Sequence, residues 1–290
     1  MNFYYVVCDT KNFSANRFYR LACLSRFTNI AYIAIFIFAL FQAHIIIAAE
    51  VDGLYHSQAI VTGTEEPERT RGFGEALKNV IVKLTGDAGL QQDHRLAALL
   101  AEPHRFVESF DYEDRMKGIP LHDEEGTRKR PHFLRVSFAQ PAIDAELERL
   151  DLRKWGSDRP LIGVWLNVRT ASDKYTVRSD GPAGYGQRAV LMDTADLLGI
   201  PIILPAANEN VLHLDDVTHF DFNKLNAALP ETDALLFGNL SITTNGYWDI
   251  VWSLHTASTD RSWALQDVTF DEALKVGLTR SALTLSGNDP

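Results

Sequence analysis

The chain has 290 residues, enough for one large domain or two small ones. Apolar residues make up 46% of it, which allows a core of ordinary size and excludes a wholly disordered protein. The net charge is −10, and setting aside the four basic residues and one acid of residues 1–49 leaves 24 basic and 37 acidic residues beyond them. A body this acidic repels phosphate backbones, which argues against nucleic acid as a partner.

Residues 1–49 have the layout of a secretion signal. Three arginines precede an unbroken apolar run from Ile30 to Phe41, and the small residues Ala48-Ala49 close the segment. The basic flank stays in the cytoplasm, so the rest of the chain crosses the membrane. We expect cleavage between Ala49 and Glu50 and a periplasmic product.

An uncleaved anchor is the alternative reading of the same segment. Residues 30–49 number 20, about the length that spans a bilayer, and would tether the protein to the inner membrane. The long stretch before the apolar run favours an anchor or a start codon assigned too early. Gln42 and His44 interrupt the run and favour a signal.

Residues 50–154 are expected to form an N-terminal α+β domain in the order β-α-(α)-β-β-α. Apolar residues three and four apart predict a helix through Phe73 and Leu84 that Gly86 ends. The other predicted elements are a strand at Leu54–Val61, a short helix at Leu96–Leu100, strands at Phe106–Tyr112 and His132–Phe138 around a polar loop at Lys117–Pro131, and a helix at Pro141–Leu150.

Residues 155–290 are expected to form a C-terminal α/β domain, reached through a joint at Trp155–Pro160. A β-α-β unit is followed by an antiparallel meander and a final helix, which Asp271 is placed to cap. The elements are strand Leu161–Val168, loop Ser179–Gly186, helix Gln187–Leu198, buried strand Ile202–Leu204, one or two short helices in Asn208–Leu229, strands Asp233–Ile242, Tyr247–Thr256 and Ser262–Phe270, and helix Asp271–Leu285. The fold class is α+β, two small α/β units after an N-terminal signal or anchor.

Several blocks of the sequence resemble the bacterial domain-of-unknown-function family 2066. The blocks are Glu50-Val51-Asp52-Gly53-Leu54-Tyr55, the helix motif from Arg71 to Gly86, Trp155-Gly156-x-x-Arg159-Pro160 with Val164-Trp165-Leu166, Gly199-Ile200-Pro201-Ile202-Ile203-Leu204-Pro205, and Asp233-Ala234-Leu235-Leu236-Phe237-Gly238 with Trp248 and Trp252. The resemblance implies an exported proteobacterial protein with no established activity. It supplies no catalytic residues.

Neither a metal site nor a phosphate loop is expected. The only His/Asp cluster is His213, Asp215, Asp216 and His219, and its histidines are six apart, whereas a helix presents two ligands on one face at a spacing of four. The glycine-rich loop Ser179–Gly186 has neither phosphate-binding order of glycines, and it reads as a plain surface loop.

Catalytic chemistry also finds little support. Both cysteines, Cys8 and Cys23, lie in the leader, which excludes thiol catalysis beyond it. Asp111 and Glu113 share a strand face and suit a solvated edge better than an acid/base dyad. The five tryptophans could line a sugar or peptide groove, but core packing is the simpler reading. They are Trp155, Trp165, Trp248, Trp252 and Trp263.

The sequence therefore favours a non-enzymatic binding or scaffold module of the periplasm, with no cofactor, no catalytic residues and no metal. Its partner would be an envelope protein or peptide, bound by strand addition at a sheet edge or in a groove. The alternatives are a sugar- or peptide-binding protein that uses the tryptophans, and a hydrolase that uses an unrecognised carboxylate site.

Overall fold

The computed structural model describes residues 49–119, 129–206, 225–227 and 229–289. They form helices and strands in mixed α+β sheets, so the predicted fold class is confirmed. The predicted leader lies outside them apart from Ala49. None of the helices in these described ranges combines the length and the apolar character that crossing a bilayer demands.

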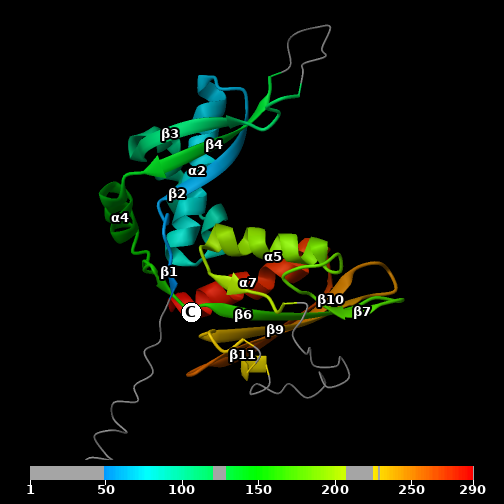
Figure 1. The fold of residues 1–290 in the computed structure, drawn as a ribbon. Helices are drawn as coiled ribbons and strands as arrows, with labels where there is room; N and C mark the ends of the chain where they lie inside the picture. Colours follow the sequence, from blue (N-terminus) through cyan, green and yellow to red (C-terminus); the bar gives the residue numbers. More distant parts are fainter. Residues whose placement is uncertain (1–48, 120–128, 207–224, 228, 290) are drawn as a thin grey trace, which may run out of the picture. The chain divides into compact units, whose positions relative to one another are not determined.

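A three-stranded antiparallel sheet carries helix α2 on one face (Figure 1). Its strand order is β2 (His56–Thr62), β4 (Pro131–Phe138) and β3 (Val107–Asp114). Alternate residues of the two adjoining strands, Ala59 and Val61 in β2 and Leu134 and Val136 in β4, are buried toward α2 (Glu66–Thr85). Their neighbours in the strands therefore point to the opposite face.

Short helical segments connect α2 to β3, and a longer helix follows β4. They are η1 (Ala88–Gln92), η2 (His94–Leu96), α3 (Ala97–Ala101), η3 (Pro103–Phe106) and α4 (Gln140–Arg149). The chain then forms β5 (Asp158–Arg159), which pairs with β1 (Ala49–Glu50). Because of this pairing, the first two described residues lie beside the predicted joint.

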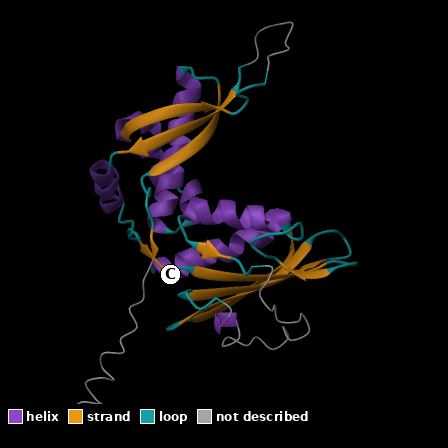
Figure 2. Ribbon diagram, in the orientation of Figure 1, coloured by secondary structure: helices purple, strands orange, loops and turns teal. Residues whose placement is uncertain are grey.

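The six-stranded sheet has the order β11-β10-β9-β6-β7, with β8 also paired to β6. Its strands are β6 (Ile162–Arg169), β7 (Lys174–Thr176), β8 (Ile202–Ile203), β9 (Ala234–Ile242), β10 (Trp248–Thr256) and β11 (Asp260–Val268). Strand β6 is parallel to β8 and β9, and β9 to β11 form the expected antiparallel meander. Helices α5 (Tyr185–Leu198) and α7 (Phe270–Ser286) pack on each other beside one face of this sheet (Figure 2).

The centre of this layer is the fully buried indole of Trp252. Its Nε1 donates a hydrogen bond of 2.9 Å to the carbonyl of Ala273 in α7. The ring fits between two glycines, since an added Cβ would lie 2.5 Å from it at Gly238 and 2.6 Å at Gly277. Close packing of the helix on the sheet therefore requires both positions to lack a side chain.

The C-terminal end of α2 is held from three directions. The last four carbonyls of a helix have no partner within it. Here the amide of Gly86 reaches Val82, the guanidinium of Arg159 reaches Lys83, the amide of Trp155 reaches Leu84, and the side chain of Asn288 reaches Thr85. All four carbonyls are therefore satisfied, by groups from the helix end, the predicted joint and the C-terminus.

Arg159 is the central residue of this arrangement. Its side chain is fully buried and donates to five carbonyls, at distances from 2.6 to 3.3 Å. The five are those of Lys83, Trp155, Gly156, Leu198 and Gly199. Burial lowers its pKa to about 10, so the side chain stays charged at neutral pH. Because α2 and α5 both end against it, their negative dipole ends offset the buried charge.

Several predicted details need correction. Helix α7 is capped by Thr269, whose hydroxyl accepts from the amide of Glu272 at 3.3 Å, and Asp271 lies in its first turn. The third meander strand is Asp260–Val268, two residues earlier than expected. The expected buried strand is the short β8, in which Ile203 is 40% exposed.

Other expectations fall partly or wholly outside the described residues. The tip of the polar loop, residues 120–128, lies outside them. Most of the segment Asn208–Leu229, which was expected to hold short helices, also lies outside them, and only residues 225–227 are described as helical. The two-domain division at residue 155 stays a prediction. The largest hydrophobic cluster contains side chains from both sides of that boundary, from Leu54 to Ala282.

Candidate functional site

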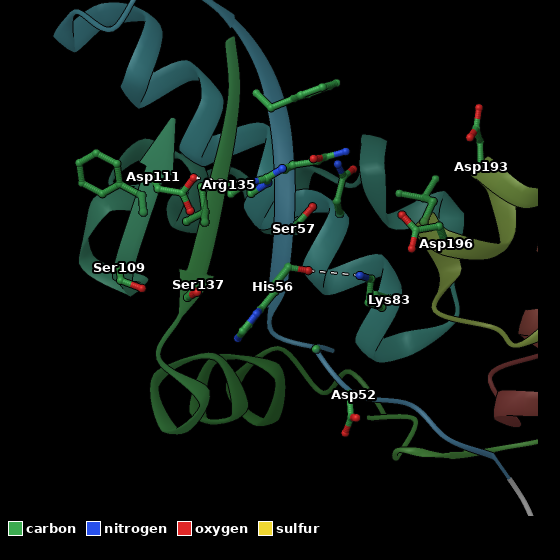
Figure 3. Close-up of a pocket in the computed structure, with 17 residues that line it drawn as sticks. Asp52, His56, Ser57, Lys83, Ser109, Asp111, Arg135, Ser137, Asp193 and Asp196 are labelled. Carbon is green, nitrogen blue, oxygen red and sulfur yellow. Dashed lines mark hydrogen bonds and ion pairs between the residues drawn. The ribbon is translucent and has the colours of Figure 1, made fainter. Parts of the chain in front are cut away.

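The open face of the three-stranded sheet is hollowed into a groove with a cavity volume of about 880 Å³. Strands β2, β4 and β3 form its floor, and residues of α2 and α5 stand along one side (Figure 3). The polar side chains that line it are Asp52, His56, Ser57, Gln58, Asn79, Lys83, Ser109, Asp111, Arg135, Ser137, Asp193 and Asp196. We call this surface the sheet groove.

The register of the sheet explains why these side chains meet. Gln58, Arg135 and Asp111 form one row across the three strands, and His56, Ser137 and Ser109 form the next. Residues opposite one another on adjacent strands point to the same face. Each row therefore places one residue from each of three distant chain segments on the groove floor.

The free edge of β2 is already occupied at three points. Lys83 donates to the carbonyl of His56 at 3.2 Å, and Arg71 donates to the carbonyl of Ile60 at 2.7 Å. The amide of Thr62 donates to the carboxylate of Glu68 at 3.1 Å. Edge strands that use their backbone groups in this way resist pairing with another chain. Strand addition along β2 is therefore disfavoured, and the groove floor is the more accessible surface.

The charges of the sheet groove are unequally matched. Arg135 is engaged by Asp111 at 3.8 Å and by Glu113. By contrast, no ion pair among the described residues involves Asp52, Asp193 or Asp196. The groove therefore has a surplus of negative charge, and Figure 3 shows two of the surplus carboxylates together on the α5 side.

Lys83 is the other cation of the groove. Burial lowers its pKa, the carboxylate of Asp196 raises it, and Arg159 lowers it further, with a net decrease. Its ammonium group is committed to the carbonyl of His56, which Figure 3 marks with a dashed line. It therefore does not neutralise the surplus acid by a direct ion pair.

A second set of polar contacts closes one end of the sheet. Tyr55 donates to Asp144 at 2.6 Å, and Lys154 donates to the same carboxylate at 2.8 Å. Burial alone would raise the pKa of Asp144, but the hydrogen bonds from Lys154 and Tyr55 outweigh it and hold that pKa below its ordinary value. The triad fastens α4 to the segment that enters β2.

The candidates from the sequence have different outcomes. The His213 cluster lies outside the described residues. Asp111 and Glu113 do share a face of an edge strand, where both contact Arg135. Of the five tryptophans, four are buried, and Trp248 is half-buried with its ring 5.6 Å from that of Phe270, so core packing is confirmed. The sheet groove itself was not predicted.

Comparison with protein families gives one match. Residues 48–156 match a Domain of unknown function (DUF8605). The resemblance to family 2066 is therefore wrong, since the matching family is a different domain of unknown function and no relation between the two is shown. The DUF8605 match spans less than half of the chain. It contains the strands of the sheet groove and α2, whereas Asp193 and Asp196 lie beyond it. No curated protein matches the chain.

Proposed function

We propose that residues 50–290 form a non-enzymatic binding module that takes a basic, extended peptide segment of an envelope protein in the sheet groove. One observation carries this proposal. The groove lies on an open sheet face, and it presents three carboxylates, Asp52, Asp193 and Asp196, that form no direct ion pair with another described residue. Opposite charge across a binding surface favours encounter and fixes register.

The shape of the groove also suits a peptide. Its floor is three strands wide and carries small hydroxyl and amide groups, including Ser109, Ser137 and Gln58, which donate or accept hydrogen bonds from a main chain. Adjacent strands lie about 4.8 Å apart, so three of them offer a floor wide enough for one extended chain with its side chains. Lysine and arginine side chains directed toward α5 would meet Asp193 and Asp196.

The test uses fluorescein-labelled peptides with the purified protein. A library of extended peptides with zero to four lysines or arginines is titrated, and fluorescence anisotropy gives each Kd. The variant Asp193→Asn/Asp196→Asn should bind the best basic peptide roughly threefold to tenfold more weakly, since each exposed ion pair contributes about 0.2–1 kcal/mol. Added salt should reduce the difference.

A control separates the groove from general electrostatics. Glu148→Gln/Glu231→Gln removes two exposed acids that do not line the groove and should leave the affinity unchanged. Equal weakening by both double variants, or peptide binding that does not depend on peptide charge, would contradict the proposal. Turnover of a peptide or ester that Ser137→Ala abolishes would favour a hydrolase, because Ser137 lies opposite His56 on the groove floor.

The periplasmic location is part of the proposal, and the leader supports it. The mass and N-terminal sequence of protein purified from cells should begin at Glu50 if the leader is removed. Full-length protein in the membrane fraction, with its body open to protease from the periplasmic side, would support the tethered form. Recovery of the full-length chain in the cytosolic fraction would refute export.

A further inference from the structure

Two cations lie side by side on the six-stranded sheet. Arg169 in β6 and Lys174 in β7 are direct partners in the antiparallel register. Val168 belongs to the hydrophobic core on the helix-covered side, so Arg169 and Lys174 point to the other face. Figure 1 shows β6 and β7 next to each other, as the register requires.

The described residues give neither cation a carboxylate within ion-pair distance. Like charges directly opposite on neighbouring strands destabilise a sheet. The protein as a whole has a net charge of −10, so two adjacent cations without an ion pair among the described residues run against its overall charge. An anion bound between the two side chains would remove the repulsion.

The surrounding side chains form a hollow rather than a flat patch. Both cations line a cavity of about 390 Å³ on the face away from α5 and α7, together with Asn167, Asn239 and Ser241. Asn167 is 7% exposed and is held in place, since it accepts from Thr176 at 2.6 Å and donates to Asn239 at 3.4 Å. A fixed amide and a hydroxyl beside two cations are groups that bind the oxygens of a phosphate.

The far side of the same hollow has a different character. Val251 and Ala264 contribute an apolar floor, and Asp249 lies opposite Ser241 in the next strand. Asp249 is two strands from Arg169, a separation of about 10 Å. A ligand that spans the hollow therefore meets cations at one end and a hydrogen-bond acceptor at the other.

From this arrangement we infer that the hollow at the β7 end of the six-stranded sheet, on the face away from α5 and α7, binds a small phosphate ester. Lys174 and Arg169 hold its phosphate, and Asn239, Ser241 and Asp249 contact its hydroxyl-bearing part. The site is separate from the sheet groove and does not depend on the peptide proposal. The glycine-rich loop Ser179–Gly186 has no part in it, as no residue of that loop lines the hollow.

The experiment titrates the purified full chain with two probes, inorganic phosphate and glycerol 3-phosphate, followed by calorimetry and by the shift of the melting temperature. Both probes should bind, and glycerol 3-phosphate should bind more tightly because its hydroxyls reach Asp249. Arg169→Gln/Lys174→Gln should lose roughly tenfold or more in affinity for both, since charge-assisted hydrogen bonds are the strong ones.

Two controls keep the outcome clear. Without ligand, Arg169→Gln/Lys174→Gln should melt no lower than the parent protein, because it removes a like-charge pair. Lys275→Gln/Arg280→Gln, which changes two exposed cations of α7 outside the hollow, should bind as the parent does. No binding of either probe, or equal loss in both double variants, would overturn the site. Equal affinity for the two probes would overturn the role of Asp249.

Discussion

Replacing Arg159 by methionine removes the donor on which two helix ends depend. Methionine fills a similar volume but cannot donate a hydrogen bond, so all the carbonyls that Arg159 contacts lose their donor at once. The carbonyls of Lys83 and Leu198 end α2 and α5, and they lie 2.7 and 2.6 Å from the guanidinium. The hydrogen bond to Leu198 is buried and that to Lys83 is partly buried, beside the ring of Trp155, which the guanidinium covers at 4.3 Å.

The expected loss of stability follows from opposing terms. Each buried carbonyl left without a partner costs about 1–3 kcal/mol. Of the five hydrogen bonds that are lost, those to Leu198 and Trp155 are buried and the other three are partly buried. Removing the buried charge returns part of that cost. We therefore expect a loss of about 3–5 kcal/mol, the range for breaking a buried charged network. A protein stable by about 5–15 kcal/mol would be close to unfolding.

Urea unfolding followed by tryptophan fluorescence and circular dichroism measures this loss. Arg153→Met is the matched control, because Arg153 is an arginine in the same region that donates to a single exposed carbonyl, that of Gly287, at 3.0 Å. Arg153→Met should lower the free energy of unfolding by less than about 1 kcal/mol. A loss below about 1 kcal/mol for Arg159→Met would refute the reasoning, since the carbonyls would then have other partners.

Three further predictions use the same unfolding assay. Gly277→Ala should lower the free energy of unfolding by about 2 kcal/mol because the new methyl group collides with the ring of Trp252. At Gly74 an added methyl group has no neighbour within 4 Å, so Gly74→Ala should raise the free energy of unfolding by about 0.5–1 kcal/mol. Thr269→Ala should lose about 1 kcal/mol with the cap of α7. The pKa of Asp144 is lowered in the folded protein, so the stabilisation by its carboxylate is present above pH 4 and is lost as the pH falls through the folded pKa. Asp144→Asn should therefore reduce the loss of unfolding free energy between pH 4 and lower pH. The same loss in the variant as in the parent protein would contradict this role of Asp144.

Sequence patterns predicted the elements whose signals are local. The spacing of apolar residues and the stop at Gly86 identified α2, and Gly86 does have the left-handed φ of 72° that such a stop requires. Asn245-Gly246 marked the first meander hairpin in the same way, with φ 85° at Gly246. The cap of α7 was misplaced because Thr269 and Asp271 both suit a cap, and only the start of the helix at Phe270 decides between them.

The sheet groove had no such signal. Its side chains come from the segment before β2 and from β2, β3, β4, α2 and α5, and the floor residues meet only because the strand register aligns them. The cation pair of the other sheet was hidden for a similar reason, since β7 is three residues long and was not predicted. The blocks that resembled family 2066 are largely apolar elements of the core. Such patterns follow from helix and strand packing and recur in unrelated proteins, which is why they misled.

The joint at Arg159 and the sheet groove are physically connected. Lys83 contributes its carbonyl to Arg159 and its ammonium to the edge of β2 in the groove. Leu198, whose carbonyl Arg159 also holds, ends the helix that carries Asp193 and Asp196. One buried guanidinium therefore fixes both helices along the α5 side of the groove. Because that contact is formed by hydrogen bonds to backbone carbonyls rather than by an ion pair, it is independent of the surface charges that would recognise a peptide. Since Arg159 holds the two helices without using the carboxylates of the groove, these carboxylates stay available to a partner while the fold fixes their spacing.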